Sequence, residues 1–138
     1  MRLLRALTDL ELRGLVEVDG GHVVSRHDLL TSVVAASITS SARKMLHRYI
    51  AQLLEDEAAS TQSVSLLWEC AEHWYYASEP ARAIQLLRRC GEHLMDVGMP
   101  MEAADVLARA IALSTGIAEQ YDIGAQRVRA LMHAEREE

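Results

Sequence analysis

The fold is decided by two segments that begin 20 residues apart, Ser78-Glu79-Pro80-Ala81-Arg82-Ala83-Ile84 and Gly98-Met99-Pro100-Met101-Glu102-Ala103-Ala104. Each segment contains a proline at a point where a helix can begin, because the first helical residue needs no N–H donor. The parallel continues further along the chain, where Leu87 matches Leu107. Small residues after each proline allow neighbouring helices to approach closely. The spacing therefore predicts successive helices that pack side by side.

Apolar residues at helical spacing predict helices on both sides of these segments. The expected helices cover residues 2–13, 28–37, 42–57, 64–77, 81–97, 101–114 and 117 to the C-terminus, with a loop at residues 60–63. Paired helices of this kind are similar to tetratricopeptide hairpins, although a 20-residue offset spans one helix rather than a whole repeat of about 34 residues. We expect residues 39–138 to form a helical-repeat domain.

The N-terminal region contains the strand signals of the chain. Leu15–Val18 and His22–Ser25 are short alternating runs, and Asp19-Gly20-Gly21 between them is typical of a hairpin turn. Gly14 is expected to end the first helix as its C-cap. A helix followed directly by a hairpin is the back half of a winged helix. We therefore expect a mainly α fold, in which residues 1–38 form a partial winged-helix segment with a β-hairpin.

A family resemblance rests on several stretches of the chain. Leu7-x-x-Leu10-x-x-Arg13-Gly14-Leu15-Val16-Glu17 and Val24-x-Arg26-His27-Asp28-Leu29-Leu30 resemble the winged-helix end of STAND-type signalling ATPases. Ala42-Arg43-x-x-Leu46-His47-x-x-Ile50-Ala51-x-x-Leu54-Glu55 and Ala71-Glu72-His73-Trp74 look like the linker helices of the bacterial members. In those proteins tetratricopeptide-like repeats come next, and residues 81–113 stand at the same place in this chain. LuxR-type transcriptional regulators share this layout.

The resemblance implies a nucleotide-sensing role for two residues. In the family, the histidine of a Met-His-Asp motif contacts the β-phosphate of ADP and holds an inactive, closed state. That role maps onto His27, with Asp28 supporting the local turn, while Arg26 replaces the methionine. ATP or ADP is then the cofactor of the full-length protein, and none is expected in this chain. Without the nucleotide-binding domain, a histidine that only caps the following helix is an equal alternative.

Several activities are disfavoured by the sequence. The chain contains no G-x-x-x-x-G-K-[ST] phosphate loop, no His-Glu-x-x-His motif and no nucleophile motif, so we expect no enzyme. The formal net charge is −6, and the sequence does not show the concentrated basic face that a nucleic-acid module needs. The 138 residues include no apolar run of the roughly 20 residues that span a bilayer. We expect no membrane contact, no N-terminal signal peptide or anchor, and a cytoplasmic location.

Two sets of side chains allow more than one interpretation. Cys70-x-x-His73 and Cys90-x-x-His93 have the composition of a zinc site, but two buried, reduced thiols are favoured, and no metal ligands are assigned. Trp68 and Tyr75 lie seven residues apart and are expected in the core rather than on a recognition surface.

These observations leave three hypotheses for function. The favoured one is a regulatory and protein-interaction segment of a STAND-type ATPase that acts in transcription regulation and signal transduction. Its winged-helix segment relays nucleotide or ligand state to the helical repeats. The partner is then another protein or the ATPase domain itself, and DNA is contacted only through a separate domain. The alternatives are a small winged-helix DNA-binding regulator that reads DNA with residues 2–13, and a stand-alone helical adaptor.

Overall fold

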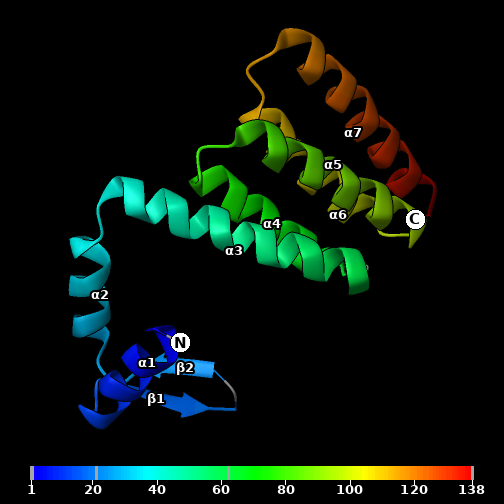
Figure 1. Cartoon of the computed structure of the whole chain (residues 1–138). Coiled ribbons are helices and arrows are strands. Elements are labelled where there is room, and N and C mark those ends of the chain that lie inside the picture. The colour runs from blue at the N-terminus through cyan, green and yellow to red at the C-terminus, as the bar shows by residue number, and fades with distance from the viewer. Residues whose placement is uncertain (1, 21, 62, 138) are drawn as a thin grey trace. The chain divides into compact units, whose positions relative to one another are not determined.

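The computed structural model describes residues 2–20, 22–61 and 63–137, and within these ranges it contains seven helices and one two-stranded sheet (Figure 1). The side chains of residues 2, 3, 30, 59–61, 136 and 137 are outside the description. The chain divides into two compact units, residues 1–40 and 41–138, whereas we expected the division after residue 38. The expected fold class, a mainly α chain in which a helix and a hairpin precede a helical array, is confirmed.

The N-terminal unit contains two helices and the hairpin. Gly14 has a φ of 67°, and the N–H of Leu15 donates to the carbonyl of Leu10 at 3.0 Å. This left-handed C-cap ends the first helix, as the sequence predicts. The strands are antiparallel, with Val16 opposite Ser25, and the turn includes Gly20 at a φ of 56°, while Gly21 lies outside the described residues. The elements are α1 (Arg2–Leu12), β1 (Val16–Asp19), β2 (His22–Ser25) and α2 (Asp28–Ser37).

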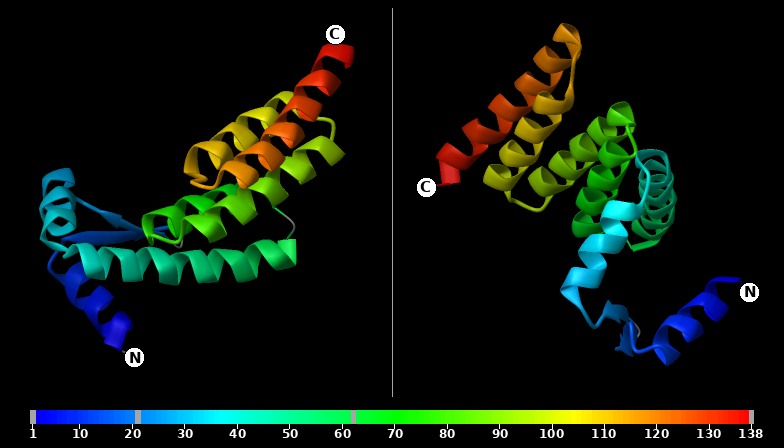
Figure 2. Two further views of the ribbon diagram at one scale, coloured as in Figure 1. Left: turned by 90° about the horizontal axis from the view of Figure 1, so that it is seen from above. Right: turned by 90° about the vertical axis from the view of Figure 1, so that its left-hand side faces the viewer.

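The C-terminal unit is built from long helices, each of which runs back alongside the preceding one (Figures 1 and 2). The first of these helices extends to residue 61, so the loop expected at residues 60–63 is wrong at its beginning; Gln62 lies outside the described residues. No glycine or proline interrupts this last turn, and Ala58 is buried there. The helices are α3 (Ser40–Thr61), α4 (Val64–Tyr76), α5 (Pro80–Asp96), α6 (Pro100–Leu113) and α7 (Ile117–Glu137).

The 20-residue period governs the core of the helical unit beyond the two segments that revealed it. One fully buried small side chain recurs at this interval on α4, α5, α6 and α7: Cys70, Cys90, Ala110 and Ala130. Each of these side chains is at most 1% exposed, so the same interval marks one packed position on each of the four helices. The buried face of α4 continues through Leu67, Ala71 and Trp74.

Helices α5 and α6 also carry the spacing of buried positions of a tetratricopeptide hairpin. The apolar pattern L-x-x-C-G-x-x-L on α5 precedes A-x-x-x-L-x-x-A on α6, and all members are buried: Leu87, Cys90, Gly91, Leu94, Ala103, Leu107 and Ala110. Gly91 marks a close approach, because a Cβ added there would lie 3.0 Å from the Cγ atom of Leu107. The two helices therefore pair through a glycine on one side and a leucine on the other.

The turns before α5 and α6 are built alike. In the first turn, Ser78 has a φ of 64°, and the N–H of Glu79 donates to the carbonyl of Trp74 at 2.9 Å. In the second turn, Gly98 has a φ of 77°, and the N–H of Met99 donates to the carbonyl of Leu94 at 2.8 Å. The sequence repeat thus becomes a repeated left-handed cap followed by a proline-started helix. Only the second turn has a glycine at this position, and glycine adopts a positive φ without strain.

We expect Ser78→Gly to raise the free energy of unfolding of the helical unit by about 0.5–1 kcal/mol, because glycine removes the strain of a Cβ in the left-handed region. The reciprocal change Gly98→Ala is expected to lower it by about 1 kcal/mol, since the added Cβ meets no atom within 4 Å and only the backbone is affected. Urea denaturation followed by circular dichroism measures both. Equal effects of the same sign would contradict the equivalence of the two turns.

Candidate functional site

His27 and Asp28 lie at the junction between β2 and α2. His27 is the residue that precedes the first turn of α2, and its backbone is extended, with a φ of −138° and a ψ of 112°. Its main chain is held by Ser25, whose hydroxyl donates to the His27 carbonyl at 3.2 Å, while the N–H of Thr31 donates to the same carbonyl at 3.1 Å. Asp28 occupies the first turn of the helix, where a carboxylate complements the helix dipole.

The imidazole of His27 is exposed and makes no hydrogen bond within the described part of the chain. His27 therefore occupies the N-cap position of α2, as the alternative expects, but its side chain makes no capping hydrogen bond. The neighbouring Arg26 is engaged, because its Nε atom donates to Glu17 at 3.0 Å across the hairpin. The junction thus presents one free imidazole on a backbone that is fixed by local hydrogen bonds.

The described side chains of the N-terminal unit form no buried core. No described side chain between residues 4 and 40 is buried, and large apolar side chains are exposed on all four elements. An apolar hollow of about 400 Å³ opens between α1, the hairpin and α2. Its wall is formed by the side chains of Leu10, Leu15, Val16, Val34, Ala35 and Ile38, with Ser25 and Thr31. A unit of this size does not bury enough apolar surface to be stable by itself.

The helical unit contains a histidine pair that the sequence reasoning did not identify. The Nδ1 atoms of His47 on α3 and His73 on α4 lie 2.9 Å apart, and the ring of Tyr76 packs against His47 with ring centroids 5.1 Å apart. Burial, together with the charges of His73 and Arg43, lowers the pKa of His47. The two histidines are 26 residues apart in the chain, so no local motif could have revealed the pair.

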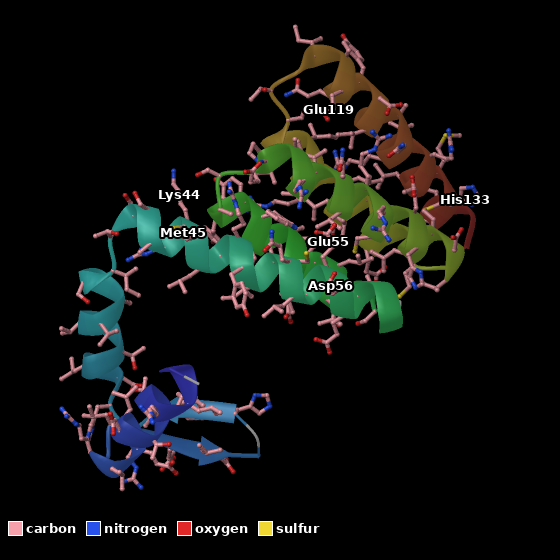
Figure 3. The ribbon with its side chains drawn as sticks, in the orientation of Figure 1. Lys44, Met45, Glu55, Asp56, Glu119 and His133 are labelled. Carbon is pink, nitrogen blue, oxygen red and sulfur yellow. The ribbon has the colours of Figure 1, made fainter. Side chains whose placement is uncertain are left out.

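We expect the helical unit to lose stability as the pH falls through 6.5, the pKa of an unperturbed histidine. The pKa of His47 is lower in the folded state than in the unfolded state, so the unfolded chain binds more protons and acid favours unfolding. His47→Gln is expected to flatten this pH dependence, whereas His133→Gln on the exposed face of α7 is expected to retain it (Figure 3). Urea midpoints measured above and below pH 6.5 test this expectation.

The two Cys-x-x-His pairs do not come together. The thiol of Cys70 donates to the carbonyl of Ala51 at 3.2 Å, and His73 faces His47. Burial, reinforced by the Glu55 carboxylate, raises the pKa of the Cys70 thiol to about 11, and burial also raises the pKa of Cys90. Both cysteines are free and buried, as expected. Over the described residues, no group of three or more His, Cys, Asp and Glu side chains could hold a metal ion.

The prediction that Trp68 and Tyr75 belong to the core is wrong. They are 38% and 40% exposed, whereas Trp74 is 2% exposed. The buried face of α4 follows Leu67, Cys70, Ala71 and Trp74, and Trp68 and Tyr75 lie one residue further along the chain, which turns them away from the neighbouring helix. Two aromatic side chains therefore stand on one accessible face of α4.

The charges on the first helix and the length and polarity of the helices bear on the expected partners. Arg5 and Arg13 of the helix proposed to read DNA are exposed, but Asp9 and Glu11 are exposed beside them. Over the part of the chain that is described, no helix is long and apolar enough to cross a membrane. Comparison with protein-family models, with curated proteins and with solved structures found no match for this chain.

Proposed function

We propose that the chain is a regulatory and protein-interaction segment of a STAND-type signalling ATPase that acts as a transcriptional regulator. In this proposal, the N-terminal unit docks onto a nucleotide-binding domain and relays its nucleotide state, and the helical unit receives the signal or a protein partner. The observation that carries the proposal is the absence of a buried core among the described side chains of residues 4–40. Such a unit requires another surface to cover its apolar side chains.

The position of His27 supports the same assignment. Its free imidazole lies beside the N-terminus of α2, where unpaired backbone N–H groups and the helix dipole favour an anion. A docked domain that holds ADP would bring a phosphate to a side chain that can donate a hydrogen bond to it. In this proposal, Asp28 does not contact the nucleotide; it supports the first turn of α2, next to His27.

The size of the native protein tests the proposal. An antibody raised against this chain is expected to detect, in extracts of the source cells, a protein several times larger than 15.4 kDa. The extra length would contain the phosphate loop that the 138 residues lack. A single species near 15.4 kDa would contradict the proposal and leave an autonomous DNA binder or helical adaptor.

The native protein also allows a test of the histidine. We expect His27→Ala to accelerate ADP release by about 10-fold or more, because a hydrogen bond to a charged group contributes roughly 1.5–3 kcal/mol. His22→Ala is the matched control, since it removes an exposed histidine from the other end of β2 and is expected to leave the rate unchanged. Equal rates for His27→Ala and the unmodified protein would remove His27 from the nucleotide site.

A further inference from the structure

An open groove lies between α4 and α6 in the helical unit. It has a volume of about 450 Å³ and is lined by Trp68, Val106 and Ser65, with the carboxylates of Glu69, Glu102 and Asp105 at its rim. Trp68 is 38% exposed, although it is one of only two tryptophans in the chain. The three carboxylates form no ion pair with any described residue. An aromatic face and uncompensated negative charge thus share one hollow.

The same unit shows how such a combination is filled elsewhere. The guanidinium of Arg82 lies 4.4 Å from the ring centre of Trp74 and 3.8 Å from the Glu55 carboxylate, which is labelled in Figure 3. The guanidinium of Arg109 lies 5.3 Å from the ring centre of Tyr75 and 3.3 Å from the Glu72 carboxylate. In both places an arginine is held by an aromatic face and a carboxylate at once.

The groove lies two helical turns away from Arg109, between the same two helices. Helices α4 and α6 run in the same direction, because each is antiparallel to α5 between them (Figure 2). Seven residues before Tyr75 on α4 is Trp68, and seven residues before Arg109 on α6 is Glu102. Tyr75 on α4 is thus paired with an arginine on α6, whereas Trp68, two turns earlier on α4, is paired with a carboxylate on α6.

We propose that this groove binds an arginine side chain of a partner peptide. The guanidinium stacks on the Trp68 ring and donates hydrogen bonds to Glu102 and Asp105, which supply the negative charge that the arginine requires. Arginine is favoured over lysine because its planar group both stacks and donates in a fork to carboxylates. The inference deepens the interaction role proposed for the helical unit and rests on it. The test of arginine binding needs no nucleotide-binding domain. A negative result in this test can therefore be told apart from a negative result in the test of His27 as a nucleotide-sensing residue.

The probe is a short acetylated and amidated peptide with two arginines between glycines, titrated into the full chain. We expect saturable shifts of the Trp68 indole N–H and Val106 amide resonances, while the Trp74 indole, which donates to Glu55 at 3.2 Å, is unchanged. The same peptide with citrulline at both positions keeps the shape and loses the charge, and it should not bind. Lysine in place of arginine should weaken binding by at least about threefold.

Two variants test the groove itself. Trp68→Ala is expected to weaken binding about fivefold or more, followed at the Val106 amide. The double variant Glu102→Gln with Asp105→Gln is expected to weaken it by a similar factor, and both side chains are exposed, so the fold is retained. The control is Glu92→Gln with Asp96→Gln on α5, which removes the same charge away from the groove.

The outcomes separate a site from general attraction to an acidic protein. Loss of affinity in the groove variants and unchanged affinity in the α5 control support the proposal. Equal loss in both double variants, equal binding of the citrulline or lysine peptide, or shifts that avoid Trp68 and Val106 would overturn it. Circular dichroism of each variant excludes unfolding as the cause of a loss.

Discussion

Trp74→Ala is expected to lower the free energy of unfolding of the helical unit by about 3–5 kcal/mol. The indole is 2% exposed, its N–H donates to Glu55 on α3, and the Arg82 guanidinium covers its face. The substitution therefore removes a large buried side chain and leaves a cavity where α3, α4 and α5 meet. It also leaves the Glu55 carboxylate without its α4 donor. Urea denaturation followed by circular dichroism measures the loss.

Trp68→Ala is the matched control for this prediction. It makes the same chemical change on the same helix, but at a side chain that is 38% exposed. We expect a loss of about 1 kcal/mol, because less apolar surface returns to water and the groove is already open to solvent. If the two substitutions cost the same, the face of α4 that packs on the neighbouring helices would differ from the one described.

Gly91→Val is expected to lower the free energy of unfolding by about 1–3 kcal/mol. A Cβ at this position lies 3.0 Å from Cγ and 3.2 Å from Cδ2 of Leu107, so the branched side chain of valine forces α5 and α6 apart. Because the conflict is with one residue, Leu107→Ala should partly relieve it. We expect the double variant to be more stable than the sum of the two single effects predicts, which a double-mutant cycle measures.

Gly124→Val on α7 is the control for the glycine substitution. Gly124 also lies inside a helix and directly follows a fully buried residue, Ile123, as Gly91 follows Cys90. A Cβ at Gly124 meets nothing within 4 Å. Valine there is expected to leave stability unchanged or slightly higher, because glycine is the poorer helix former. A loss equal to that of Gly91→Val would show that the contact with Leu107 does not decide the cost.

The helices of the chain could be predicted because their signals are local. Pro80 and Pro100 start α5 and α6, Gly14 ends α1, and the pattern of small residues after each proline marks the packed face. The end of α3 could not be predicted in the same way. Polar residues at its C-terminus look like a loop, but burial of Ala58 against the core keeps the last turn helical.

The candidate sites also differ in whether local sequence could predict them. His27 and Asp28 could be named from a short motif, and their place before α2 follows from the hairpin that precedes them; their role in nucleotide sensing stays a prediction. The His47–His73 pair and the Trp68 groove could not be found from sequence. Each joins residues of different helices that are more than 20 positions apart. Their geometry depends on the rotation of each helix about its own axis.

By itself, the sequence determined where most of the helices and the hairpin form, that the start of α5 is repeated 20 residues later at the start of α6, and that the chain lacks a phosphate loop. Local propensity, capping and turn chemistry act within a few residues, and the sequence displays them directly. Only the tertiary structure decided which tryptophan is buried, which histidines meet and which carboxylates surround an open groove. Those outcomes depend on how the faces of α3 to α6 pack against one another, because one residue along a helix turns a side chain by about 100°.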